Sequence, residues 1–130
     1  MELHDQRYIV GIDLGTTNSA VAYVDLQADN APRRTNIFRI PQLTGPGEIN
    51  DLPVLPSFLY IPGEYDIAKT AVVMPWQRPA DHFAGTLARD HGAQVPSRLV
   101  ASAKSWMCHA NADRRAKILP WGGGDEGAKV

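Results

Sequence analysis

The sequence predicts an α/β fold in which an N-terminal antiparallel strand meander is followed by short strands and helices. The segment Tyr8–Leu14 (YIVGIDL) is almost continuously apolar and rich in β-branched residues, which is typical of a buried strand. Residues 15–18 make a compact turn, and residues 19–26 then alternate roughly, so these segments predict a hairpin. Residues 35–40 alternate as well and predict the third strand of the meander.

Short elements are expected in the middle of the chain. Residues 41–56 hold four prolines and two glycines, which remove ladder donors and oppose a helix, so we expect an exposed loop. Residues 57–61 (SFLYI) predict a short strand, with residues 65–67 as its partner across a Pro-Gly-Glu turn. A helix is expected over residues 79–91, because Pro79 suits its first turn and Gly92 its end.

The clearest predicted helix covers residues 97–108. At about 100° per residue its apolar side chains fall on one stripe, and Lys104 lies at the edge of that stripe. The stripe consists of Leu99, Val100, Ala103, Trp106 and Met107. Residues 122–130 are glycine-rich and show no periodicity, so a flexible tail is expected there, after one folded unit in residues 1–121.

Composition excludes several classes of partner. The chain has 130 residues, a formal net charge of −1 and an isoelectric point near 6.4, so it holds one domain and no basic field for nucleic acid or an acidic membrane. The single cysteine, Cys108, excludes an intrachain disulfide and a multi-cysteine zinc site. The first residues lack the basic and apolar regions of a signal peptide. We therefore expect a cytoplasmic protein with no nucleic-acid or membrane partner.

The residues that carry chemistry cluster in the string GIDLGTTNS, residues 11–19. Gly15 lets the backbone approach a ligand closely, and successive turn amides form a concavity that favours an anion. Thr16, Thr17 and Asn18 add donors at its rim. Asp13, at the end of the strand, is suited to accept hydrogen bonds from water on Mg²⁺, because that ion keeps several waters and favours carboxylates. The string therefore predicts a phosphate site.

Two common nucleotide motifs are missing. The chain has no G-x-x-x-x-G-K-[ST], and its glycines lack the G-x-G-x-x-G spacing that opens a helix. The turn leads into a strand instead. This favours the strand-turn-strand phosphate clamp of the actin-like ATPases over P-loop and dinucleotide-binding folds.

The segment GIDLGTTNSAVAYV (residues 11–24) closely resembles the first phosphate motif of the 70-kilodalton heat-shock chaperones, the DnaK-like family. Three further pieces occur in that family's order. Residues 55–58 (LPSF) resemble its Thr-Pro-Ser strand start, residues 66–68 (DIA) lie near its usual Val-Gly, and the Lys104 helix resembles its catalytic-lysine helix. Residues 97–121 resemble a divergent bacterial branch of the DnaK-like proteins. The resemblance implies that residues 1–121 are the N-terminal part of the first lobe of an actin-like, ribonuclease H-like, nucleotide-binding domain.

The resemblance also implies roles for single residues. Asp13 would face the hydrated Mg²⁺, and Gly15, Thr16, Thr17 and Asn18 would hold the β- and γ-phosphates of ATP or ADP. Lys104 would position the attacking water. Phosphoryl transfer depends on positioning and charge stabilisation, which an ammonium near the γ-phosphate supplies. In a full-length parent these residues would hydrolyse ATP to drive protein folding, with unfolded polypeptide clients, J-domain co-chaperones and nucleotide exchange factors as partners.

Several parts of the resembled family cannot be located in the sequence. These are the second phosphate loop, the adenosine pocket, the peptide-binding β domain and the helical lid, so we expect weak nucleotide binding and inefficient turnover by this chain alone. Two alternatives stay open: a complete non-catalytic binding module or degenerate remnant of the fold, and a fragment of an actin-like sugar or acid kinase. On the simplest structural interpretation, Asp13 caps an ordinary hairpin turn and Lys104 extends into water.

Overall fold

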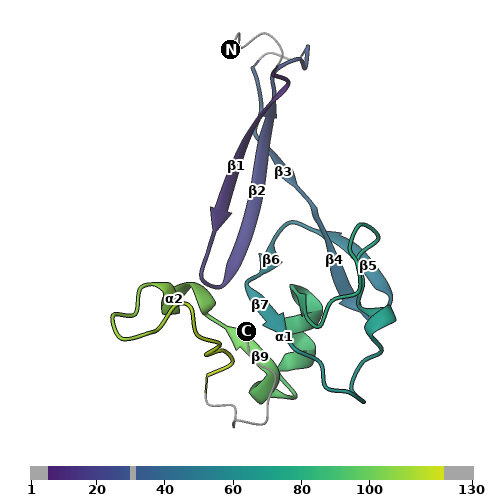
Figure 1. Cartoon of the computed structure of the whole chain (residues 1–130). Coiled ribbons are helices and arrows are strands. Elements are labelled where there is room, and N and C mark those ends of the chain that lie inside the picture. The colour runs from purple at the N-terminus through teal and green to yellow at the C-terminus, as the bar shows by residue number, and fades with distance from the viewer. Residues whose placement is uncertain (1–5, 30–31, 122–130) are drawn as a thin grey trace.

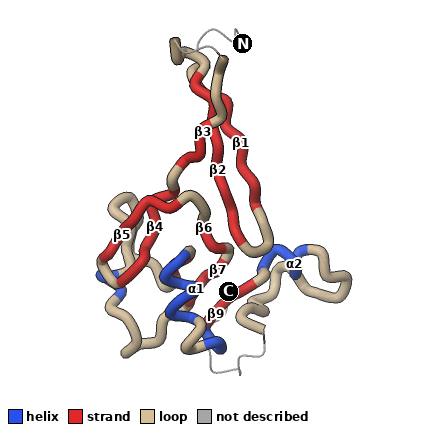
Figure 2. Tube along the Cα trace, turned by 180° about the vertical axis from the view of Figure 1, so that it is seen from behind, coloured by secondary structure: helices blue, strands red, loops and turns tan. Residues whose placement is uncertain are grey.

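The computed structural model describes residues 6–29 and 32–121. A long hairpin of β1 (Tyr8–Leu14) and β2 (Asn18–Asp25) rises from a lower part that contains both helices (Figure 1). The view from behind in Figure 2 shows that the hairpin meets this lower part at its turn. The predicted tail, residues 122–130, lies outside the described residues.

The predicted meander is confirmed. β1 pairs with β2 in an unbroken antiparallel register from Tyr8 opposite Asp25 to Leu14 opposite Ser19. On its other side β2 pairs with β3 (Asn36–Phe38), and near the turn it pairs with the short β6 (Leu55–Pro56). β1 is therefore an edge strand of this sheet among the described residues.

The prediction that residues 41–56 form an exposed loop is wrong. They belong mostly to an antiparallel hairpin of β4 (Ile40–Gly45) and β5 (Glu48–Leu52). The prolines do not prevent this, because the sheet has only two strands and Pro41 lies on an edge strand, where a missing donor costs little. Pro46 and Gly47 occupy the turn, and the positive φ of Gly47, 72°, is one that glycine adopts freely.

The strand expected at residues 57–61 is confirmed as β7 (Phe58–Tyr60), but the expected partner is wrong. β7 pairs antiparallel with β8 (Phe83–Ala84) and β9 (Leu99–Ala101) instead of with residues 65–67. Residues 65–67 include Asp66, whose carboxylate bonds the side chains of Tyr60 and His91. That carboxylate keeps the segment in a loop across the end of the sheet.

Both predicted helices are shorter than expected. α1 (Thr86–Gly92) ends where Gly92 predicted, but its start is seven residues after Pro79, because β8 occupies the intervening chain. The expected helix over residues 97–108 is wrong: a 3-10 helix (Pro96–Arg98), β9 and α2 (Ala103–Met107) share this segment. The apolar residues of the predicted stripe are divided between β9, which buries Val100, and the separate short helix α2. Periodicity alone cannot distinguish this combination from one continuous helix.

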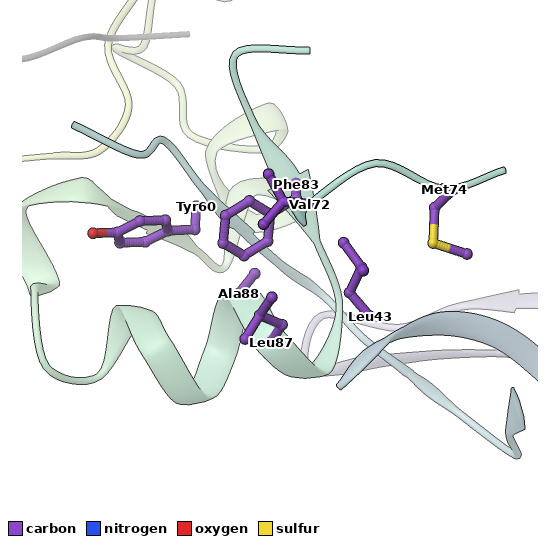
Figure 3. Close-up of a cluster of buried hydrophobic side chains, with 7 residues drawn as sticks. All are labelled: Leu43, Tyr60, Val72, Met74, Phe83, Leu87 and Ala88. Atoms are coloured by element: carbon purple, nitrogen blue, oxygen red, sulfur yellow. The ribbon is translucent and has the colours of Figure 1, made fainter. Parts of the chain in front are cut away.

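The hydrophobic core lies in the lower part, where α1 packs on β7, β8 and β4 (Figure 3). The core includes side chains from α1, β7, β8 and β4 and from the loop after a 3-10 helix (Lys69–Ala71). Its members are Leu43, Tyr60, Val72, Met74, Phe83, Leu87 and Ala88. The β1–β2 hairpin adds nothing to this cluster, and large apolar side chains of β1 are exposed, Ile12 by 64% and Leu14 by 66%.

Candidate phosphate-binding site

The turn between β1 and β2 is as tight as the sequence predicts. A Cβ on Gly15 would lie 2.1 Å from the backbone oxygen of Asn18, so no other residue fits this backbone without moving it. Among the described residues, no hydrogen bond uses the N–H of Thr16 or Thr17. The turn is therefore closely folded, and it has amide donors available for a ligand.

Ser57 holds the turn from outside. Its hydroxyl donates to the carbonyl oxygen of Gly15 at 2.8 Å, and its N–H donates to the carbonyl oxygen of Thr17 at 2.8 Å. The hydroxyl also lies 3.4 Å from that of Ser19. Because β6 pairs with the start of β2, Asn18 opposite Pro56, Ser57 is delivered directly beneath the turn. The LPSF segment thus contacts the turn and donates to its carbonyl groups at Gly15 and Thr17.

Lys104 approaches the same place from a distant part of the chain. Its Nζ donates to the carbonyl oxygen of Leu14 at 2.6 Å, across 90 positions of sequence. β9 pairs with β7 through Ala101 and Phe58, and Ser102 then turns the chain into α2 with a left-handed φ of 54°. This path places the exposed Lys104 ammonium at the end of β1.

Asp13 directly precedes Leu14 and lies opposite Ala20. Its side chain is exposed, and because strand residues alternate, it points to the opposite face from Leu14. The described residues contain no group of three or more His, Cys, Asp or Glu side chains able to hold a metal ion. Asp13 is a single exposed carboxylate at the end of β1, so a magnesium ion held there would have to keep most of its waters.

All of the predicted site residues gather at one end of the hairpin: Asp13, Gly15, Thr16, Thr17, Asn18 and Lys104. Sequence reasoning missed the bracing roles of Ser57 and of the Leu14 carbonyl. The sequence signal for Ser57 was its position as a residue with a hydroxyl group directly before a predicted strand. The sequence does not show which carbonyl group that hydroxyl binds. The Leu14 carbonyl left no signal, since every residue has one.

The largest pKa perturbation lies elsewhere, in the lower part. Burial, and then a hydrogen bond to Asp66, raise the pKa of Tyr60 to about 12. Burial opposes ionisation of Asp66, but hydrogen bonds from Tyr60 and from His91, at 2.7 Å, outweigh it and hold the pKa of Asp66 below its ordinary value. These hydrogen bonds attach the loop of residues 65–67 to β7 and α1, so the cluster has a structural role.

No protein-family model, curated protein or solved structure matches this chain. Within residues 6–29 and 32–121, none of the helices has the length and apolar character that crossing a membrane requires. The functional interpretation of the turn therefore depends on its own residues and geometry.

Proposed function

We propose that the turn of residues 13–18 and Lys104 bind the phosphates of MgATP, and that the chain is the N-terminal part of the nucleotide-binding domain of a DnaK-like chaperone. One observation carries this proposal. Lys104 reaches the carbonyl oxygen of Leu14 at 2.6 Å, so the only lysine of its helix lies beside the phosphate motif. An ordinary hairpin gives no reason for a distant cation at that point.

Each group has a chemical task under this proposal. The N–H groups of Thr16 and Thr17 and the rim side chains donate to phosphate oxygens, as backbone concavities do for anions. Asp13 accepts hydrogen bonds from water on the magnesium ion. The Lys104 ammonium has more than one N–H, so it can keep its bond to Leu14 and still donate toward the γ-phosphate or the attacking water. Gly15 keeps the concavity open.

The full activity belongs to a longer cytoplasmic protein. There, ATP hydrolysis would drive the folding of unfolded polypeptide clients, with J-domain co-chaperones and nucleotide exchange factors as partners. The residues described surround the phosphates from one side, while phosphoryl transfer needs charge stabilisation from all sides. For this chain alone we therefore expect weak binding of the phosphate chain and little turnover.

Isothermal titration calorimetry at low ionic strength tests the site. Magnesium tripolyphosphate and MgATP should bind with similar affinity, and adenosine should not bind, because the contacts are to phosphate. Gly15→Ala should abolish this binding, since its Cβ would displace the turn. Gly11→Ala is the matched control, because a Cβ at Gly11 meets nothing within 4 Å. Equal binding by the two variants, or no binding of either phosphate compound at millimolar concentration, would refute the proposal.

Lys104 is tested separately through catalysis. In a longer form that hydrolyses ATP, Lys104→Ala should leave ATP binding largely intact and abolish hydrolysis. Lys117→Ala removes the same charge from another exposed position and serves as the control. Normal turnover in the Lys104 variant would exclude its catalytic role.

A further inference from the structure

Ser57 binds two carbonyl groups of the turn between β1 and β2, and each of them belongs to a peptide unit with an N–H on its other side. The Ser57 hydroxyl donates to the carbonyl oxygen of Gly15, and the Ser57 N–H donates to that of Thr17, both at 2.8 Å. Both peptide units are trans, so the C=O and the N–H of each unit point in opposite directions. The N–H groups of Thr16 and Asn18 are therefore directed away from Ser57.

The pairing of β2 with β6 supports this direction for the Asn18 N–H. Asn18 lies opposite Pro56, and the Ser57 N–H bonds the carbonyl of the residue before Asn18. In an antiparallel ladder this spacing belongs to a pair of residues that exchange no hydrogen bonds with each other, and Pro56 has no N–H to donate. The Asn18 N–H thus points away from β6. Outside the strand ladders of the described residues, no hydrogen bond uses the N–H of Thr16 or Asn18.

The two sides of the turn differ in their access to solvent. β6 lies beside the turn (Figure 1), with Pro56 buried and Ser57 half-buried. Thr16, Thr17 and Asn18 are exposed. The carbonyl side of the turn is therefore covered by this chain, where water competes weakly for the bonds of Ser57. The N–H groups lie on the side that a ligand can reach.

We propose that Ser57 is a positioning residue of the phosphate site: its hydroxyl holds the Gly15 carbonyl so that the Thr16 N–H is aimed at the bound phosphate. This inference rests on the phosphate binding proposed above. A peptide unit that is already held by its carbonyl loses less freedom when its N–H meets a ligand. The same bond polarises the unit, which makes its N–H a stronger donor. Ser57 lies on the other side of the turn and acts on the ligand only through this peptide unit.

The hydroxyl and the N–H of Ser57 have separable effects. The N–H is retained in every substitution except proline, so it continues to hold the peptide unit that carries the Asn18 N–H. The hydroxyl alone holds the unit that carries the Thr16 N–H. The Ser19 hydroxyl is 3.4 Å from that of Ser57, whose single O–H is donated to Gly15, so Ser19 is the donor in this contact. Loss of the Ser57 hydroxyl should therefore act on the Thr16 N–H and spare the Asn18 N–H.

Amide NMR spectra of the isotope-labelled chain, titrated with magnesium tripolyphosphate, test this inference. In the wild type the amide protons of Thr16 and Asn18 should both move downfield at saturation, because both donate to phosphate oxygens. In Ser57→Ala the shift of Thr16 should be lost, the shift of Asn18 should remain, and the affinity should fall about tenfold, which is the scale of one hydrogen bond. A general weakening of the fold would change the two amides alike.

Three further variants separate the hydrogen bond from the shape of the side chain. Ser57→Thr keeps the hydroxyl and should restore both the Thr16 shift and the affinity. Ser57→Cys keeps the approximate size but offers a much weaker donor, so it should behave as Ser57→Ala does. Ser19→Ala is the matched control, because it removes a hydroxyl from the same cluster and leaves both bonds of Ser57 in place. It should bind tripolyphosphate as the wild type does.

The outcomes distinguish this inference from the proposed function. If the wild type binds tripolyphosphate and Ser57→Ala and Ser57→Cys bind it equally well with an unchanged Thr16 shift, the positioning role of Ser57 is overturned and the phosphate site stands. Equal loss of both amide shifts in Ser57→Ala, without recovery in Ser57→Thr, also overturns the role, because Ser57 would then support only the fold. If the wild type itself does not bind tripolyphosphate, the proposed function falls, and this inference falls with it.

Discussion

Gln42 is the buried polar side chain on which the junction between β4 and α1 depends. It is 3% exposed, and its amide nitrogen donates to the carbonyl oxygen of Val54 at 2.8 Å. Its amide oxygen accepts from the N–H and the hydroxyl of Thr86, at 3.0 and 2.8 Å. Thr86 opens α1, and Gly85 before it has no side chain to cap the helix. Gln42 therefore supplies the missing cap from another element.

The substitution Gln42→Leu keeps the approximate volume and removes all three bonds. Val54 is exposed, so its carbonyl can turn to water, while the two donors of Thr86 lose their acceptor in a half-buried place. Each such group costs about 1–3 kcal/mol, so we expect a loss of about 3 kcal/mol in the free energy of unfolding. For a domain with about 5–15 kcal/mol in total this is a large fraction.

Urea unfolding followed by tryptophan fluorescence measures the loss. The transition midpoint should fall by about 1–3 M if the slope is that of a small protein. Gln94→Leu makes the same chemical change at an exposed position of the chain and should alter stability by less than about 0.5 kcal/mol. A loss below about 1 kcal/mol at Gln42, or one no larger than at Gln94, would refute this account of the junction.

Three further predictions concern the other polar contacts. The pKa of Tyr60 is raised to about 12, so the unfolded chain loses this proton at a lower pH than the folded chain does. The free energy of unfolding should therefore fall as pH rises from about 10 to about 12 in the wild type but not in Tyr60→Phe. The lowered pKa of Asp66 contributes stability above about pH 3.8 that is lost as pH falls through the folded value, so Asp66→Asn should show a shallower acid loss. Ser57→Ala, measured by urea unfolding, should cost about 1 kcal/mol, while the exposed Ser97→Ala should not. Flat profiles in the wild type, or equal losses for the two serines, would contradict these expectations.

The hairpin could be predicted from the sequence because its determinants are local. The apolar run of β1, the glycine that alone fits at position 15 and the alternation of β2 all lie within one short segment. The same holds for the end of α1 at Gly92. In each case the residue pattern and the structure it specifies occupy the same stretch of chain, so no knowledge of distant contacts was needed.

Most of the elements that were wrongly predicted are fixed by distant contacts. β9 exists because Leu99–Ala101 adds to the edge of β7, forty residues earlier, and this pairing overrides the helical period of residues 97–108. The β4–β5 hairpin is different, because its contacts are local: it was missed because its prolines lie on an edge strand and in the turn, where they are compatible with a hairpin. In the site, the clamp of Ser57 on the turn and the bond of Lys104 to Leu14 also depend on the tertiary fold.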